Sequence, residues 1–450
     1  MKVVSKKSVL SGHVAVPGSK SHTIRSLILA ALADGVSHIS NPLEGKDSYS
    51  TAEALKKIGA DITVKGKVWT VQGAGANIHL PDSPIDVGNS GSLMYFLAPI
   101  LATLDGDCTF TGDESICRRP VDHLLDALEQ LGARTKYEKN TGYPPFSFSG
   151  PIDIDKKLVT DGVLSQYISG FMMAATRMNG TCNIELTNPK ETPYLKMTKM
   201  WLDIAGSKVK ISKDYKKIEV EGPSNIEGFD INIPSDWESV AFPLIAALIS
   251  DSEIIIDNID CTGSQGDDKI VDILKSVGAN IEIDKKQHEL KVRGNKRLST
   301  KGLPRKTLKI NISDFPDAIC ALAVIACFIE GKTIITDLDM CRRKETDRVK
   351  AMAKILFELG ADIRDEVDSL IIVGHCPYNP DGTQNTMCRL HGGKVDPYND
   401  HRIAMAMACF GLGLRNGESI EIKNGECCNV SFPNFYDVMN KLGAGFGLSE

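Results

Sequence analysis

A pattern of apolar stretches closed by a small-residue pair recurs six times along the chain. Each stretch ends in a leucine- or isoleucine-rich turn followed by glycine. The endings are KKIGA at Gly59, EQLGA at Gly132, LDIAGS at Gly206, KSVGA at Gly278, FELGA at Gly360 and NKLGA at Gly443. They recur roughly every 72 to 83 residues, which is the spacing of an internal repeat. Because glycine is the usual residue just past a helix, where φ turns positive, each ending predicts a helix C-terminus.

Each repeat also begins with a long apolar stretch that follows a polar turn. These stretches are SKSHTIRSLILAALADG, NSGSLMYFLAPILATLDG, SQYISGFMMAATRMNG, SDWESVAFPLIAALIS, DFPDAICALAVIACFIEG and NDHRIAMAMACFGLGLRNG. They are apolar around most of a helix circumference, so they predict buried helices. Each apolar stretch is followed by a β-rich segment such as KTIITD, then by a charged loop and a more amphipathic second helix. This second helix is expected on the outside of the domain. The pattern predicts an α/β protein of six repeated units, grouped three and three.

The polar starts of the buried helices have two interpretations. A buried helix must satisfy its first four N–H groups, and an anion in a cleft does this because partial positive charge collects at that end. Alternatively, the Ser, Asn and Asp residues there are ordinary N-caps. For a single unit the N-cap interpretation is the better one. Six copies, several beside basic residues, favour a shared anion-binding cleft.

Composition narrows the class of protein. The length of 450 residues exceeds what one hydrophobic core serves, so two domains are expected. A net charge of −6 argues against a general nucleic-acid binder. The apolar runs are too short to span a bilayer, and the first 20 residues lack the apolar core of a secretory signal. The 12 cysteines show no CxxC pair or zinc-ligand spacing, so free thiols in the cytoplasm and no metal site are expected.

Four groups of polar residues are candidates for chemistry. GSKSHTIR carries Lys20, Ser21 and Arg25; GNSGS spans 88–92; CRRPVD carries Arg118 and Arg119; and a fourth group combines RRKETDR, with Lys344, Glu345 and Arg348, and NDHR, with Asp400, His401 and Arg402. Taken alone, RRKETDR is typical of a solvated helix start and GNSGS of an ordinary turn. Their equivalent places in the repeat predict that they converge on one cleft with Asp317. Such a set of cations suits a small compound with a carboxylate and a phosphate.

In this order and spacing, GSKSHTIR, GNSGS, RRP, SQ, KETDR and NDHR resemble the 3-phosphoshikimate 1-carboxyvinyltransferase (EPSP synthase) family of enolpyruvyl transferases. The resemblance covers essentially the whole chain, and KETDR together with NDHR is its most specific part. The related UDP-N-acetylglucosamine enolpyruvyl transferases typically have asparagine where this chain has Ser21, and they lack NDHR.

The resemblance implies a fold of two inside-out α/β domains, each of three repeats with buried helices. The chain would cross between the domains twice. The expected domains are residues 18–235, and residues 1–17 together with 236–450. The N-terminal strand would therefore belong with the C-terminal half.

The resemblance also implies an activity, namely transfer of the enolpyruvyl group of phosphoenolpyruvate to a hydroxyl of shikimate 3-phosphate with release of phosphate. By motif position the catalytic residues would be Asp317, Glu345 and Lys20. The acceptor would contact Ser21, Arg25, Ser165, Gln166, Tyr194 and Lys344, and phosphoenolpyruvate would contact Lys20, Gly91, Arg119, Arg348 and Arg402. Asp317 has a second interpretation as the N-cap of the next helix. No cofactor or metal is implied, the partners are small molecules, and a monomer is expected.

Several positions depart from the family pattern. Tyr95 and Val430 replace an arginine and a lysine, and Met340 replaces an asparagine. Leu164 and Glu191 replace serines at positions that the resemblance assigns to the acceptor's phosphate. A charge-assisted hydrogen bond is worth roughly 1.5–3 kcal/mol, so each loss predicts binding weaker by about tenfold or more.

Three interpretations of these departures stay open from the sequence. The chain is a divergent EPSP synthase, a related enolpyruvyl transferase with another acceptor alcohol, or a non-catalytic binding relative. The retained acid–base residues weigh against the third, because a protein that only binds has no need for them.

Overall fold

The computed structural model describes residues 1–294 and 297–449 and divides into two compact units. The N-terminal-half unit is Gly18–Pro234. The C-terminal-half unit is Met1–Pro17 together with Ser235–Glu450. Relative to the sequence expectation the second crossing lies one residue earlier, so Ser235 groups with the C-terminal half.

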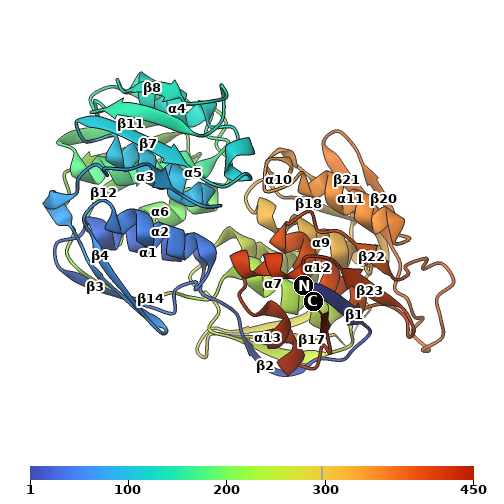
Figure 1. The fold of residues 1–450 in the computed structure, drawn as a ribbon. Helices are drawn as coiled ribbons and strands as arrows, with labels where there is room; N and C mark the ends of the chain where they lie inside the picture. Colours follow the sequence, from blue (N-terminus) through green and yellow to red (C-terminus); the bar gives the residue numbers. More distant parts are fainter. Residues whose placement is uncertain (295–296, 450) are drawn as a thin grey trace. The chain divides into compact units, whose positions relative to one another are not determined.

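The N-terminal-half unit contains three repeats (Figure 1). Its elements are α1 (Lys20–Leu32), β3 (Val36–Ser40), α2 (Lys46–Lys56), β4 (Asp61–Lys65) and β5 (Val68–Gln72); β6 (Ile85–Asp86), α3 (Gly91–Leu101), β7 (Gly106–Thr111), α4 (Asp122–Gln130), β8 (Arg134–Tyr137) and β9 (Phe146–Gly150); β10 (Leu158–Thr160), α5 (Ser165–Ala174), β11 (Gly180–Leu186), α6 (Thr192–Ile204), β12 (Lys208–Ile211), β13 (Lys217–Gly222) and β14 (Asp230–Asn232).

The C-terminal-half unit contains the other three repeats. Its elements are β1 (Lys2–Lys6), β2 (Ser11–Ala15), α7 (Trp237–Ile249), β15 (Glu253–Asp257), α8 (Lys269–Ser276), β16 (Asn280–Asp284) and β17 (Glu289–Arg293); β18 (Thr307–Asn311), α9 (Ile319–Ala326), β19 (Gly331–Thr336), α10 (Asp339–Arg342), α11 (Arg348–Glu358), β20 (Asp362–Asp365) and β21 (Ser369–Gly374); β22 (Gly393–Val395), α12 (His401–Leu412), β23 (Ser419–Ile422), α13 (Phe435–Lys441) and β24 (Gly447–Ser449).

All six repeats build the same four-stranded sheet. In β6-β7-β9-β8, for example, β6 is parallel to β7, and β9 is antiparallel to both of its neighbours. The parallel pair requires a crossover, and α3 makes it. Each of the other five described sheets likewise has one parallel pair of strands at one edge, followed by two antiparallel pairs. This shared topology confirms the predicted six-fold α/β repeat.

Two sheets borrow strands from distant parts of the chain. The first repeat of the N-terminal-half unit takes its parallel strand from β14, at the end of that unit. In the C-terminal-half unit, β2 pairs in parallel with β15, and β1 pairs with β23 and β24. The first seventeen residues therefore complete two sheets of the C-terminal half.

The first helix of each repeat is buried as predicted. In the N-terminal-half unit α3 packs along α5, and in the C-terminal-half unit α12 packs against α7 and α9 (Figure 1). Every residue of α9 and α12 is buried. The second helices are amphipathic: α4 buries Leu124, Leu125, Ala127 and Leu128, and its other side chains are more exposed. The polar residues that begin the first helices therefore lie at the N-terminal ends of buried helices.

The glycine that closes each second helix has the backbone conformation that the sequence predicts. The six φ values are +111° at Gly59, +102° at Gly132, +75° at Gly206, +96° at Gly278, +88° at Gly360 and +103° at Gly443. A residue with a Cβ is strained in this conformation, so glycine is favoured at all six ends.

All 12 cysteines lie among the described residues, and all are free thiols. Eight are buried and four are partly buried. Among the helices of residues 1–294 and 297–449, none is both long enough and apolar enough to traverse a bilayer.

Candidate active site

Asp317 is the centre of a charged cluster in the C-terminal-half unit. It lies in a short 3₁₀ turn, Pro316–Ala318, that leads into α9. Lys344 Nζ lies 3.1 Å from its Oδ2, and Arg348 Nη1 lies 2.5 Å from its Oδ1. Arg402 Nε forms an ion pair with the same Oδ1 at 3.2 Å. The N-cap of α9 is Ala318, so the alternative interpretation of Asp317 as that N-cap is wrong.

Arg348 is fully buried, although the charged segment around it looks solvated in the sequence. Its Nε donates to Asp400 Oδ2 at 2.8 Å, and its Nη2 donates to Glu345 Oε2 at 2.6 Å. Burial by itself lowers the pKa of Arg348, but the carboxylates of Asp400, Glu345 and Asp317 outweigh it and hold that pKa well above its usual range. Asp347, whose carboxylate accepts from the Lys350 N–H at 2.9 Å, is the true cap of α11.

Arg402 occupies the first turn of α12, where the Asp400 carboxylate caps the helix by accepting from the Arg402 N–H at 3.0 Å. Its Nη2 also forms a buried ion pair with Glu238 of α7. Burial alone lowers the pKa of Arg402, whereas Glu238 and Asp317 raise it above its usual range. Glu238 was missed by the sequence analysis, because the SDWES turn contains no motif that pairs it with a residue so distant.

Asp267 is a second residue that the sequence analysis missed. It is buried in the 3₁₀ turn Gly266–Asp268, ahead of α8. Burial raises the pKa of its carboxyl well above the usual range, and the nearby charges of Glu238 and Asp317 raise it further. The QGD triplet in the sequence is a weak signal, since a polar turn before a helix is common.

The raised pKa of Asp267 predicts a pH-dependent stability. The folded protein keeps a proton on this carboxyl to higher pH than the unfolded chain, which releases it above about pH 4. Asp267 therefore destabilises the fold increasingly as pH rises. Asp267→Asn should therefore raise the melting temperature more at pH 8 than at pH 5, measured by calorimetry. Asp272→Asn, on the exposed side of α8, is the matched control. An equal change for Asp267→Asn at both pH values would contradict the prediction.

Lys20 and Ser21 begin α1 in the N-terminal-half unit. Lys20 Nζ lies 3.8 Å from Asp47 Oδ2 of α2, and both side chains are largely buried. The Ser21 carbonyl accepts a hydrogen bond from Arg25 Nη1 at 3.1 Å, one turn along the helix. Ser21 and Arg25 are thus linked directly within the first turns of α1.

Arg25 is buried and is held by neutral groups. Its Nε donates to Thr198 Oγ1 at 2.8 Å, and its Nη2 lies 3.4 Å from both Ser169 Oγ and the Tyr194 carbonyl. Burial lowers the pKa of Arg25 to about 9, while Tyr194 and Glu191 act in the opposite direction. The guanidinium therefore keeps its charge at neutral pH in an environment poor in hydrogen-bonded counter-ions.

The glycine turn before α3 brings further predicted residues together. Arg119 Nη2 donates to Asn89 Oδ1 at 2.8 Å and to Ser115 Oγ at 3.2 Å. A Cβ added to Gly91 would lie 3.3 Å from Arg119 Nη1, so the glycine lets the guanidinium approach the backbone. Gln166 Nε2 donates to Ser92 Oγ at 2.9 Å, which joins the starts of α5 and α3.

Three departures from the family pattern have local structural roles. Tyr95 is buried in α3, and its hydroxyl donates to the Pro120 carbonyl at 3.0 Å. Met340 is buried in α10. Val430 ends the 3₁₀ segment Gly425–Val430.

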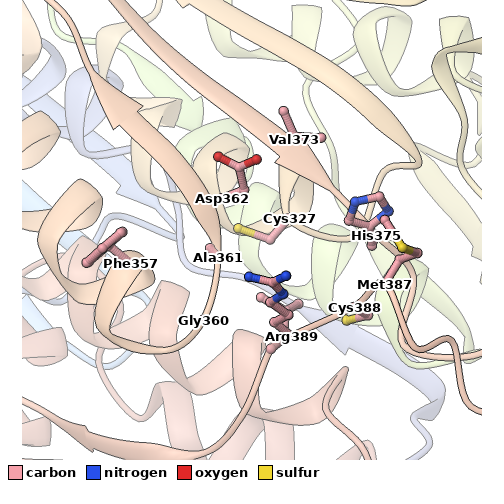
Figure 2. A pocket seen from close by; sticks show the side chains of 11 residues that line it. Cys327, Phe357, Gly360, Ala361, Asp362, Val373, His375, Met387, Cys388 and Arg389 are labelled. Carbon is pink, nitrogen blue, oxygen red and sulfur yellow. The ribbon is translucent and has the colours of Figure 1, made fainter.

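Other candidate sites lie apart from the predicted residues. Among the described residues, His13, Asp257 and Glu289 form the one group of possible metal ligands whose ligand atoms lie within 4.8 Å of one another, and these side chains are exposed or partly exposed. A pocket of about 420 Å³ lies between α11, β20 and the segment after β21 (Figure 2). Its lining includes Cys327, Phe357, His375, Met387 and Arg389, and no predicted site residue.

Comparison with known proteins identifies the family of the chain. The sequence pattern of the family described as EPSP synthase (3-phosphoshikimate 1-carboxyvinyltransferase) matches residues 4–439. The chain belongs to this family. It is 35% identical over 445 residues to the 3-phosphoshikimate 1-carboxyvinyltransferase of Acetivibrio thermocellus, covering 99% of each chain. It is 36% identical over 447 residues to that of Methanocaldococcus jannaschii, covering 98% of each.

A solved structure agrees with these relatives. EPSP synthase from Acinetobacter baumannii superposes with a TM-score of 0.80 at 27% identity, over 100% of both chains. The resemblance drawn from the motifs is therefore confirmed, and so is the predicted fold class. Membership of this family makes the chain an enolpyruvyl transferase of the shikimate pathway.

Proposed function

We propose that the charged cluster around Asp317 and the acceptor-binding residues around Arg25 carry out enolpyruvyl transfer from phosphoenolpyruvate to shikimate 3-phosphate. The observation that carries this proposal is the Asp317 carboxylate, which Lys344, Arg348 and Arg402 approach together. A carboxylate held among three cations, beside a second carboxylate at Glu345, combines proton transfer with anion binding.

The reaction is an addition followed by an elimination. A proton adds to the CH2 carbon of phosphoenolpyruvate, positive charge develops at the adjacent carbon, and the acceptor hydroxyl attacks there as it loses its proton. The bond from this carbon to the phosphate oxygen then breaks, and the methyl group returns a proton to restore the double bond. Phosphate is released, and no redox change occurs.

The C-terminal-half unit supplies the groups for proton transfer and for the donor carboxylate. Asp317 takes the proton of the acceptor hydroxyl, and Glu345 handles the proton of the donor CH2 carbon. Arg348 and Arg402 bind the donor carboxylate. Arg348 is already bonded to Asp317 and Glu345. When the donor binds, its carboxylate therefore replaces these two carboxylates as the partner of Arg348.

The N-terminal-half unit supplies residues for the acceptor and for the donor's phosphate. Ser21, Arg25, Ser165, Gln166 and Tyr194 bind the acceptor. The donor phosphate contacts Lys20, Arg119 and the Gly91 amide. The proximity of Gly91 to Arg119 supports this assignment, since backbone N–H groups and a guanidinium together suit a phosphate.

Phosphate release is the direct test of the function. The purified chain should release phosphate from phosphoenolpyruvate only when shikimate 3-phosphate is present, at a typical enzyme rate on the order of 1–10³ per second. A panel of other alcohols, including unphosphorylated shikimate, tests the interpretation that another acceptor is used. Turnover with a different alcohol and none with shikimate 3-phosphate would contradict the proposal.

Arg402→Lys should weaken donor binding by about tenfold or more, because lysine keeps the charge beside Glu238 and Asp317 but loses the planar fork that matches a carboxylate. Calorimetry with phosphoenolpyruvate in the presence of shikimate 3-phosphate measures this. Arg364→Lys, exposed on β20, is the matched control. Unchanged donor affinity in Arg402→Lys would remove Arg402 from the donor site.

We also propose that the chain works in the cytoplasm as a monomer on small-molecule substrates. Its 12 free thiols support a reducing compartment. Light scattering at micromolar concentration should give the mass of one chain, and a dimer mass would refute the monomer.

A further inference from the structure

Glu191 is held in an unusual position at the start of α6. Its backbone has φ 51° and ψ 35°, in the left-handed region that non-glycine residues seldom adopt. Its side chain is buried, with the residue only 3% exposed. A strained backbone and a buried carboxylate each cost free energy, so their combination at one residue indicates a specific role.

The Glu191 carboxylate caps the buried helix α5. Its Oε2 accepts from the Ser165 N–H at 3.1 Å and from the Ser165 hydroxyl at 3.0 Å. The N-cap residue of this helix is Leu164, which provides no side-chain acceptor. Glu191 therefore supplies from another element the acceptor that Leu164 lacks, and it places a negative charge where the helix dipole favours one.

The same carboxylate compensates the buried charge of Arg25. Within the described residues, the hydrogen bonds of Arg25 run to hydroxyl and carbonyl oxygens and to no carboxylate. Burial lowers the pKa of Arg25, and the negative charge of Glu191 acts against this effect. The Glu191 carboxylate is thus bonded to the start of α5, and its charge also acts on Arg25.

We propose that the Glu191 carboxylate is an internal stand-in for the phosphate of the acceptor, and that it leaves the start of α5 when the phosphorylated acceptor binds. This inference rests on the proposed function. A phosphate needs a buried cation and N–H donors. Both Ser165, whose N–H and hydroxyl bond to Glu191, and Arg25, on which the charge of Glu191 acts, belong to the acceptor-binding set. Two anions at this place repel each other, so phosphate and Glu191 bind there in competition.

Competition makes Glu191 a specificity-determining residue. It lowers the affinity for a phosphorylated acceptor, because the phosphate must displace the carboxylate. It leaves the affinity for the unphosphorylated alcohol nearly unchanged, because that compound does not enter the anion position. The measurable quantity is the ratio of the two affinities.

The test compares Glu191→Gln with the wild-type protein, using shikimate 3-phosphate and shikimate as separate ligands in calorimetry. Glutamine keeps the size and the acceptor oxygen but removes the charge. Shikimate 3-phosphate should bind at least tenfold more tightly to the variant, and shikimate within about twofold of the wild type. The variant without ligand should melt at a lower temperature, and shikimate 3-phosphate should raise its melting temperature by more than it raises that of the wild type.

The double variant Leu164→Ser with Glu191→Ser is the second test. It replaces the carboxylate by neutral hydroxyls and returns a capping side chain to position 164, so its preference for shikimate 3-phosphate over shikimate should rise as well. Glu219→Gln, on the exposed side of β13, is the matched control. An unchanged ratio, a parallel change for both ligands, or weaker phosphate binding in the Glu191 variants would overturn the inference. Phosphate release by the wild-type protein with shikimate 3-phosphate tests the proposed function separately.

Discussion

Arg348→Met should destabilise the protein by about 3–5 kcal/mol, because it leaves the carboxylates of Asp317, Glu345 and Asp400 around a buried site without their shared cation. Asp400 has no exposed side-chain surface and Arg348 has none either, so water cannot replace the lost charge without opening the fold. Urea unfolding followed by circular dichroism measures the loss of stability.

Arg343→Met is the matched control for this prediction. Arg343 is exposed, and its ion pair with Asp339 at 3.3 Å is a surface contact. Its removal should cost less than about 1 kcal/mol. A similar small loss for Arg348→Met would show that the cluster is not held by this arginine.

Asp317→Asn should lower kcat by about 10²- to 10⁴-fold, the usual contribution of a positioned general base. The amide has nearly the same shape, so the fold should remain intact. Donor affinity should stay the same or increase, since Arg348 and Arg402 lose a competing carboxylate. Phosphate-release kinetics together with donor calorimetry separate the two effects.

Asp314→Asn is the control for Asp317→Asn. Asp314 pairs with Lys269 at 2.7 Å and is only partly buried. Its replacement should leave kcat within about twofold of the wild type. A kcat for Asp317→Asn within threefold of the wild type would remove Asp317 from the proton-transfer role.

The fold was predictable in kind because it is repeated. One glycine-ended helix is weak evidence, but six at similar spacing indicate a structural unit, and the positive φ of Gly59, Gly132 and their four counterparts has a local steric cause. The strand exchanges were not predictable from the pattern itself. The parallel pairing of β14 with β3 joins residues that lie far apart in the chain, and no local periodicity records this.

The candidate site was predictable where a motif carries its residues together. KETDR places Lys344, Glu345 and Arg348 within five positions, and the structure brings all three to Asp317 or to one another. Composition alone favours a solvated helix start for this segment. Arg348 is instead buried, and its Nε donates to Asp400, a residue more than fifty positions away in the chain.

By itself, the sequence determined the α/β class, the six repeats, their helix ends and the residue types available for anion binding, because backbone conformation and apolar periodicity depend on neighbours within a few positions. Only the tertiary structure decided how the charges are paired. Arg402 meets Glu238 across 164 positions, Asp267 is buried beside other acids, and Glu191 caps a helix that begins 26 positions earlier. The physical reason is that electrostatic free energy depends on distance and burial in space, and both are set by packing between elements rather than by order along the chain.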